Sequence, residues 1–174
     1  MANTYTLISS VTVGSGGAAN IEFTSIPSTY TDLQLVYSFR DTRPAEIAWQ
    51  TDLTFNNVGG TSYAVMVLRG QGTSASSFSV SSQSSDIYNL AVSALSTSNT
   101  FNNGSIYIPN YTSSNNKSYS TDTVTENNAT TAYATLMAGL FSNSSAISSI
   151  KIAANGIYSF VQYSTAYLYG ISNA

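Results

Sequence analysis

The segment Asp32-Leu33-Gln34-Leu35-Val36-Tyr37-Ser38-Phe39-Arg40 gives the clearest indication of the fold. Leu33, Leu35, Tyr37 and Phe39 recur at every second position, so their side chains share one face of an extended chain. This period of two is typical of a β-strand that is buried on one side. The segment therefore predicts a strand whose apolar face is turned towards a core.

The same period recurs along the whole chain, interrupted by turn sequences such as Gly14-Ser15-Gly16-Gly17 and Gly70-Gln71-Gly72. Roughly ten short strands at intervals of about 8–12 residues are typical of an antiparallel sandwich or barrel. No change in composition marks a linker, and no fixed-period repeat is visible. We therefore expect one domain over residues 1–174, folded as an all-β, antiparallel, jelly-roll-like β-sandwich.

Four segments carry more specific expectations. Tyr63 to Leu68 is apolar at every position, which predicts a central strand packed from both sides. Thr131 to Phe141 is expected to be a strand rather than a helix, because Thr, Tyr and Gly weaken the helical alternative that Ala, Leu and Met favour. The polar segments Ser74 to Ser85 and Asn110 to Asn116 are expected to be loops, since they have little apolar surface to bury, although Phe78-Ser79-Val80 within the first is also a candidate strand.

The composition argues against catalysis. Only 7% of the residues are charged, and the chain has neither histidine nor cysteine. It therefore lacks the usual group for proton transfer near neutral pH, the thiolate nucleophile and the nitrogen and sulfur ligands of transition metals. The eight carboxylates are spread singly over separate segments. We expect no enzymatic activity, no cofactor and no metal site.

The charge pattern limits the possible partners. The net charge is −3 and the five Lys and Arg residues are scattered, whereas a nucleic-acid binder usually carries a basic stripe. No apolar run is long enough to span a bilayer, and the first residues show no charged leader followed by an apolar stretch. Binding to nucleic acid, insertion into a membrane and a signal peptide are therefore not expected.

One charge-dense stretch stands out as a candidate partner-binding segment. It contains Arg40, Asp41, Arg43 and Glu46 and is followed by Trp49, the only tryptophan. Arg and Trp often anchor protein–protein contacts, which favours an interface loop. The alternative is a solvated loop with local ion pairs and a partly buried tryptophan.

The 13 tyrosines divide into two groups by sequence context. Tyr37, Tyr63 and Tyr107 lie in apolar alternation and are expected in the core, with their hydroxyl groups reaching an edge. Others lie among polar residues, where exposed tyrosine is typical of adaptable binding surfaces and sugar platforms. This second group comprises Tyr30, Tyr111, Tyr119 and Tyr163. Tyr111 is also one of the partner-binding candidates.

The strand and turn patterns resemble those of small virion proteins from tailed phages, especially phages of cyanobacteria and marine bacteria. The resemblance spans nearly the whole chain but includes no catalytic signature. The segments that carry it are residues 4–17, 21–27 and 30–33, Asn56 to Tyr63, Gly70-Gln71-Gly72 and Tyr167-Leu168-Tyr169-Gly170-Ile171.

The resemblance implies a virion component that is made in the host cytoplasm. Proteins of this kind are commonly jelly-roll-like and trimeric. The leading expectation is a capsid decoration (cement) protein, a homotrimer that contacts the major capsid protein or other virion proteins. The alternative is a tail-fibre or receptor-binding protein that recognises host surface glycans.

Overall fold

The computed structural model describes residues 4–44, 51–83, 86–87, 91–126 and 132–172. Over these residues the chain forms two antiparallel β-sheets, one of eight strands and one of four, and no helix. The strands of the large sheet are, in spatial order, β1 (Tyr5–Thr12), β12 (Thr165–Ile171), β3 (Asp32–Ser38), β8 (Asn103–Ile108), β9 (Lys117–Glu126), β10 (Ala132–Phe141), β5 (Tyr63–Gln71) and β6 (Ser74–Gln83). Those of the small sheet are β2 (Asn20–Phe23), β11 (Ile150–Ala153), β4 (Thr51–Phe55) and β7 (Asp86–Ile87).

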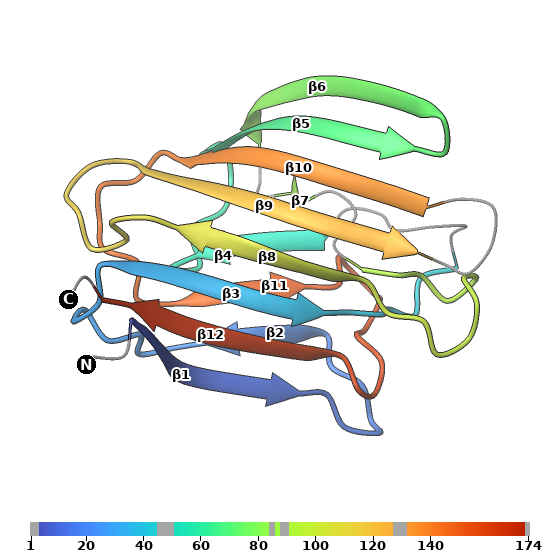
Figure 1. Ribbon diagram of the computed structural model, residues 1–174. Helices are drawn as coiled ribbons and strands as arrows, with labels where there is room; N and C mark the ends of the chain where they lie inside the picture. Colours follow the sequence, from blue (N-terminus) through green and yellow to red (C-terminus); the bar gives the residue numbers. More distant parts are fainter. Residues whose placement is uncertain (1–3, 45–50, 84–85, 88–90, 127–131, 173–174) are drawn as a thin grey trace.

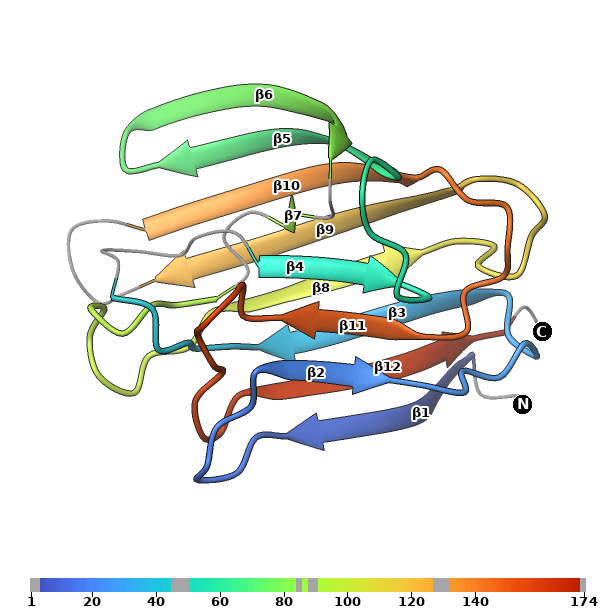
Figure 2. The same ribbon diagram turned by 180° about the vertical axis from the view of Figure 1, so that it is seen from behind.

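The two sheets form the layers of a sandwich, with the narrower sheet lying across one face of the wider one (Figure 1; Figure 2 shows the small sheet in front). Successive strands repeatedly cross between the layers: β1, β3 and β12 belong to the large sheet, whereas β2, β4 and β11 belong to the small one. All strand pairs are antiparallel, and β1 at one edge pairs with β12 from the end of the chain. The predicted all-β, jelly-roll-like sandwich is confirmed.

The core lies between the sheets and is built from the alternating residues. In β3 the predicted alternation is confirmed, because Leu33, Leu35 and Tyr37 are buried and Phe39, directly after the strand, is buried with them. The rings of Tyr37 and Phe39 stack with centroids 4.9 Å apart, and Phe39 packs on Phe160 at 4.7 Å. These aromatic contacts join the large sheet to the segment that precedes β12.

The prediction of a loop over Ser74 to Ser85 is wrong, because residues 74–83 form the edge strand β6. Its backbone pairs with β5 from Gln71↔Ser74 to Tyr63↔Gln83. An edge strand needs hydrogen bonds on one side only. Phe78 and Val80 of this strand pack against the core. Serine is tolerated at other positions because an edge strand buries few side chains.

The prediction that Tyr63 to Leu68 is packed from both sides is also wrong. Tyr63, Val65 and Val67 face the core, whereas Met66 and Leu68 on the opposite face are 59% and 54% exposed. The small sheet covers one face of the large sheet, and nothing in the described part of the chain covers the other. An apolar run therefore does not by itself identify a strand buried on both faces.

Two of the specific expectations are confirmed. Residues 132–141 form a strand, β10, whose side chains alternate between buried and exposed from Thr135 onward. Residues 110–116 form a turn between β8 and β9. In β10 the strand prevails over the helical alternative because β5 and β9 pair with it on both sides along most of its length.

Tyr63 shows how a tyrosine is accommodated in this core, where Tyr37 and Tyr63 are buried as predicted. The Tyr63 hydroxyl donates to the carbonyl of Val58 and accepts from the backbone N–H of Phe55, both at 2.9 Å. Burial raises the pKa of Tyr63 to about 12 from an ordinary value of 10.0. Ionising this hydroxyl would place a charge in the core and remove its donated hydrogen bond.

The stability of the fold is therefore expected to fall at alkaline pH. Because the pKa of Tyr63 is higher in the folded chain than in the unfolded one, its contribution is complete below pH 10 and is lost as the pH rises towards 12. Urea unfolding between pH 9 and pH 12 measures this loss. Tyr63→Phe should be less stable at pH 8 by about 1 kcal/mol and should lose less stability over the alkaline range. An unchanged pH dependence in Tyr63→Phe would assign the effect to other groups, among them Tyr37, whose pKa is also raised by burial.

Candidate contact surface on the large sheet

The outer face of the eight-stranded sheet, turned away from the small sheet, gathers most of the exposed large hydrophobic side chains. Cross-strand register places them in one lattice, because residues paired across neighbouring strands point to the same face. Leu7 belongs here through its partner Tyr169, which alternates with buried Leu168. The exposed set on this face is Tyr5, Leu7, Val36, Met66, Leu68, Tyr107, Val124, Leu136, Leu140 and Tyr167.

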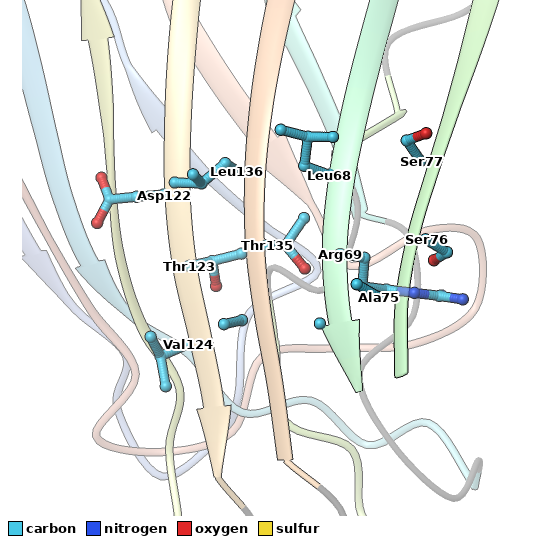
Figure 3. Close-up of a pocket in the computed structure, with 12 residues that line it drawn as sticks. Leu68, Arg69, Ala75, Ser76, Ser77, Asp122, Thr123, Val124, Thr135 and Leu136 are labelled. Carbon is cyan, nitrogen blue, oxygen red and sulfur yellow. The ribbon is translucent and has the colours of Figure 1, made fainter. Parts of the chain in front are cut away.

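Five of these residues form an aliphatic patch over β9, β10 and β5: Met66, Leu68, Val124, Leu136 and Leu140. Leu68 and Leu136 are direct cross-strand partners, and Figure 3 shows them side by side on β5 and β10. Leu136 is 59% exposed and Val124 45% exposed. An apolar patch of this kind on a soluble protein marks a contact surface, because leaving it in water forfeits the free energy of burial.

A shallow groove of about 540 Å³ lies within this patch. Small residues form its floor, since Gly70 pairs with Ala75 on β6 and with Ala134 on β10. Leu68 and Leu136 border it on one side, and Figure 3 shows Val124 below them on β9. Large side chains beside a row of small ones give ridges and hollows that an apolar partner surface can fill.

Among the residues that the structure describes, none places a positive charge on the outer face. All five cations of the chain lie elsewhere: Arg40, Arg43 and Lys117 are buried, Arg69 alternates with Leu68 and faces the other side of the sheet, and Lys151 is on the small sheet.

Two acids of this face, Asp32 and Asp122, accept hydrogen bonds from the chain itself. Ser105 donates to Asp122, and Tyr107 donates to Asp32. The face is thus apolar and hydroxyl-rich rather than charged.

A tyrosine patch occupies the other end of the same face, over β1, β12 and β8, and consists of Tyr5, Tyr107, Tyr167 and Tyr169. The rings of Tyr5 and Tyr169 meet edge to face with centroids 6.5 Å apart. The Tyr107 hydroxyl donates to Asp32 at 2.8 Å, and this hydrogen bond raises the pKa of Tyr107. The expectation that Tyr107 is a core residue is wrong, because it is 37% exposed. Tyr107 lies between the buried residues Ile106 and Ile108 of β8, so its side chain points to the opposite face of the sheet.

The predicted partner-binding arginine Arg40 binds its own chain instead. Its side chain is buried, and its guanidinium donates four hydrogen bonds to backbone carbonyls of residues 94–100: to Thr97 at 2.8 Å, Ser96 at 3.0 Å, Thr100 at 3.1 Å and Ala94 at 3.2 Å. Burial lowers the pKa of Arg40, and the charge of Asp41 opposes this shift. Arg40 thus holds a loop of this chain in place and offers little to an external partner.

Asp41 and Arg43 lie beside Arg40 and are also buried. The Arg43 guanidinium lies 3.7 Å from the Asp41 carboxylate, donates to the carbonyl of Ala154 at 3.1 Å and stacks over the ring of Tyr158 at 5.0 Å. Burial raises the pKa of Asp41, against the hydrogen bond and the charge that Arg43 supplies. The sequence analysis offered local ion pairs as the alternative to an exposed interface loop. Local ion pairing describes Asp41 and Arg43 better.

Tyr111, a further candidate, is not part of this cluster. Tyr111 is fully buried, donates a hydrogen bond to the carbonyl of Pro27, and has its pKa raised by burial. The expectation of an exposed Tyr111 is therefore wrong, and that of an exposed Tyr119 is wrong as well, whereas Tyr163 is exposed as predicted. The polar neighbours of Tyr111 belong to the turn, while its ring reaches the core. Glu46 and Trp49 lie outside the described residues.

Sequence reasoning missed the aliphatic patch. The available signal was that Met66, Leu68, Leu136 and Leu140 add apolar residues at the positions that alternate with the core-facing ones. Strands that are apolar on both faces need a second covering layer, either within the chain or from a partner. The structure supplies only one layer over the described residues, which makes the other face available for contact.

Neither a metal cluster nor a membrane-spanning helix is found in the described ranges. There, no three side chains of the types His, Cys, Asp and Glu come close enough together to hold a metal ion. In the same ranges, no helix has the length and apolar character needed to cross a membrane.

Comparison with known proteins adds little to this description. No protein-family model matches the chain, and no curated protein matches it. Among solved structures, it is similar to the CBM2 module of the evolved Dit of Lactobacillus casei BL23 phage J-1, at 13% sequence identity over 89% of this chain and 70% of that one. The TM-score is 0.26.

Proposed function

We propose that this protein is a structural component of a phage virion and that it acts as a capsid decoration protein. The observation that carries the proposal is the aliphatic patch on a sheet face without cations, which is suited to lasting contact with another protein. The resemblance of the strand and turn patterns to small virion proteins supports the assignment to a phage particle.

The mechanism is mechanical. Leu68, Leu136 and Val124 would be buried against an apolar, uncharged surface of the major capsid protein, at about 1.5–3 kcal/mol for each fully buried side chain. With no cation on this face, the contact depends little on salt, unlike one that is made by exposed ion pairs. In this proposal three copies assemble around a symmetry position of the shell and bridge its subunits against the pressure of the packaged DNA.

Electron cryomicroscopy of virions with and without the gene tests the location of the protein. Regular density on the capsid lattice that disappears in the deletion virion is the expected result, together with a lower temperature of DNA release. Density confined to the tail, with loss of adsorption to host cells, would contradict decoration and favour the tail-fibre alternative.

The aliphatic patch is tested separately by the double substitution Leu68→Asp, Leu136→Asp. The variant is expected to fold, because both side chains already face solvent, and to lose incorporation into virions by at least tenfold when it is supplied to the deletion strain. Ile157→Asp is the matched control, since Ile157 is 92% exposed and lies outside the sheets. Normal incorporation of the double variant would show that the patch is not the contact.

A second candidate function is glycan recognition by a tail-fibre or receptor-binding protein. The observation that favours it is the tyrosine patch, because exposed aromatic side chains among hydroxyl and amide groups suit binding to sugars. Of the sequence-based candidates for this role, Tyr111 is buried and does not belong to the patch, and Trp49 lies outside the described residues.

A further inference from the structure

The tyrosine patch surrounds a polar side chain that the fold leaves unused. Gln34 on β3 is the cross-strand partner of Tyr169 on β12 and of Tyr107 on β8, so it lies between the two rings. Its side chain is half-buried, and its amide makes no hydrogen bond to any residue that the structure describes. An amide has two donor hydrogens and an acceptor oxygen, and these are available here between two aromatic faces.

The spacing of the rings is set by the sheet. Neighbouring strands lie about 4.8 Å apart, so Tyr169 and Tyr107, on either side of β3, project from backbones roughly 10 Å apart. Tyr167 precedes Tyr169 by two residues and extends the row along β12. The hydrogen bond from Tyr107 to Asp32 and the edge-to-face contact between Tyr5 and Tyr169 limit the movement of these rings.

We propose that the tyrosine patch binds a neutral saccharide chain. The rings of Tyr107 and Tyr169 would pack on the C–H faces of successive sugar units, and the Gln34 amide would bond to hydroxyl groups between them. The site uses different residues from the aliphatic patch, from which it is separated by the polar Ser105 and Ser120. It therefore stands independently of the proposed capsid contact and rests on the second candidate function, glycan recognition, for which it names the class of ligand.

The charge of the face selects the class of saccharide. Anionic sugars and phosphate-bearing glycans are usually held by Arg or Lys, and all five cations of this chain lie away from the outer face. The Asp32 carboxylate at the rim of the patch would repel an anion further. A neutral polymer needs no Arg or Lys and is not repelled by Asp32.

Native gel electrophoresis of the full chain in gels that contain a polysaccharide tests the proposal. The probes are a neutral glucan, a mannan and a galactan, with alginate as the anionic comparison. We expect at least one neutral polymer to slow the wild-type protein, and the Kd for that polymer to rise by roughly tenfold or more in the double variant Tyr107→Ala, Tyr169→Ala. Gln34→Ala is expected to weaken binding to a smaller extent.

Two controls separate a lost site from a damaged fold. Tyr163→Ala removes an exposed tyrosine outside the large sheet and should leave binding unchanged. The double variant Tyr107→Phe, Tyr169→Phe keeps both rings and should retain most of the affinity, even if the alanine variant unfolds. Leu68→Asp, Leu136→Asp should bind like the wild type, which distinguishes this site from the capsid contact. Slowing by alginate alone, no slowing by any neutral polymer, or equal affinity in the alanine variant would overturn the proposal.

Discussion

Replacing Arg40 with alanine is expected to lower the free energy of unfolding by about 3 kcal/mol. The guanidinium donates to four carbonyls of residues 94–100, and these carbonyls would lose that donor while the loop remains attached to the fold. Urea unfolding at pH 7 measures the loss. Limited proteolysis should show faster cleavage within residues 94–100, because local opening there becomes easier.

Arg40→Lys gives an intermediate test of the same interaction. The lysine keeps the charge, but its ammonium group has three donors on one atom and does not reproduce the planar fork that bonds four carbonyls. Lys151→Ala is the matched control for loss of a cation, with an expected change of at most about 0.5 kcal/mol. If the free energy of unfolding of Arg40→Ala changed as little as that of Lys151→Ala, the hydrogen bonds of Arg40 would not be what holds this loop.

Replacing Gly139 with valine is expected to prevent folding or to cost about 3 kcal/mol or more. Gly139 on β10 faces the core, and a Cβ atom added there would fall within the ring of Tyr119 on the neighbouring strand β9. A phenol ring held in a buried position cannot move aside without displacing Phe55, against which it packs edge to face at 5.5 Å. Thermal unfolding followed by circular dichroism checks this expectation.

Gly70→Ala is the matched control, because Gly70 lies in the same sheet and the nearest atom to an added Cβ would be the carbonyl oxygen of Ala134, at 3.9 Å. It should be neutral or stabilise the fold by up to about 1 kcal/mol. The double variant Tyr119→Ala, Gly139→Ala should recover part of the stability that Gly139→Ala loses, since the clash is then removed. Additive losses in this cycle would show that the ring and the glycine are not coupled.

The same relation between a tyrosine and a glycine occurs at two further places. A Cβ atom on Gly104 would meet Tyr37, and one on Gly170 would meet Tyr30. Glycine within a strand is often found at such a close approach, although Gly70 is not. The sequence shows the glycines but not the rings that cover them, because the two members of each pair are far apart in the chain and are brought together only by the tertiary fold.

Most of the fold could be predicted from the sequence, whereas little of the candidate surface could. Alternation depends on local geometry, so it identified β3 correctly, and the residue types that disfavour a helix identified β10. Beyond Phe78-Ser79-Val80, strand β6 was assigned to a loop, because an edge strand is stabilised by the backbone of β5 and needs few apolar residues of its own. The predicted contact residues Arg40, Asp41 and Arg43 were misplaced because charge density in the sequence does not reveal whether the chain itself supplies the partners.

The sequence by itself determined that this protein is an all-β sandwich with very few charges, because the period of two and the composition are properties of the chain alone. Only the tertiary structure decided which of the two apolar faces of β5 and β10 is covered. A period of two places Leu68 and Leu136 on one face and Val67 and Met137 on the other, but it does not say which face meets the small sheet. Strand order and the packing of the layers make that choice, and they leave Leu68, Leu136 and the tyrosine patch facing solvent.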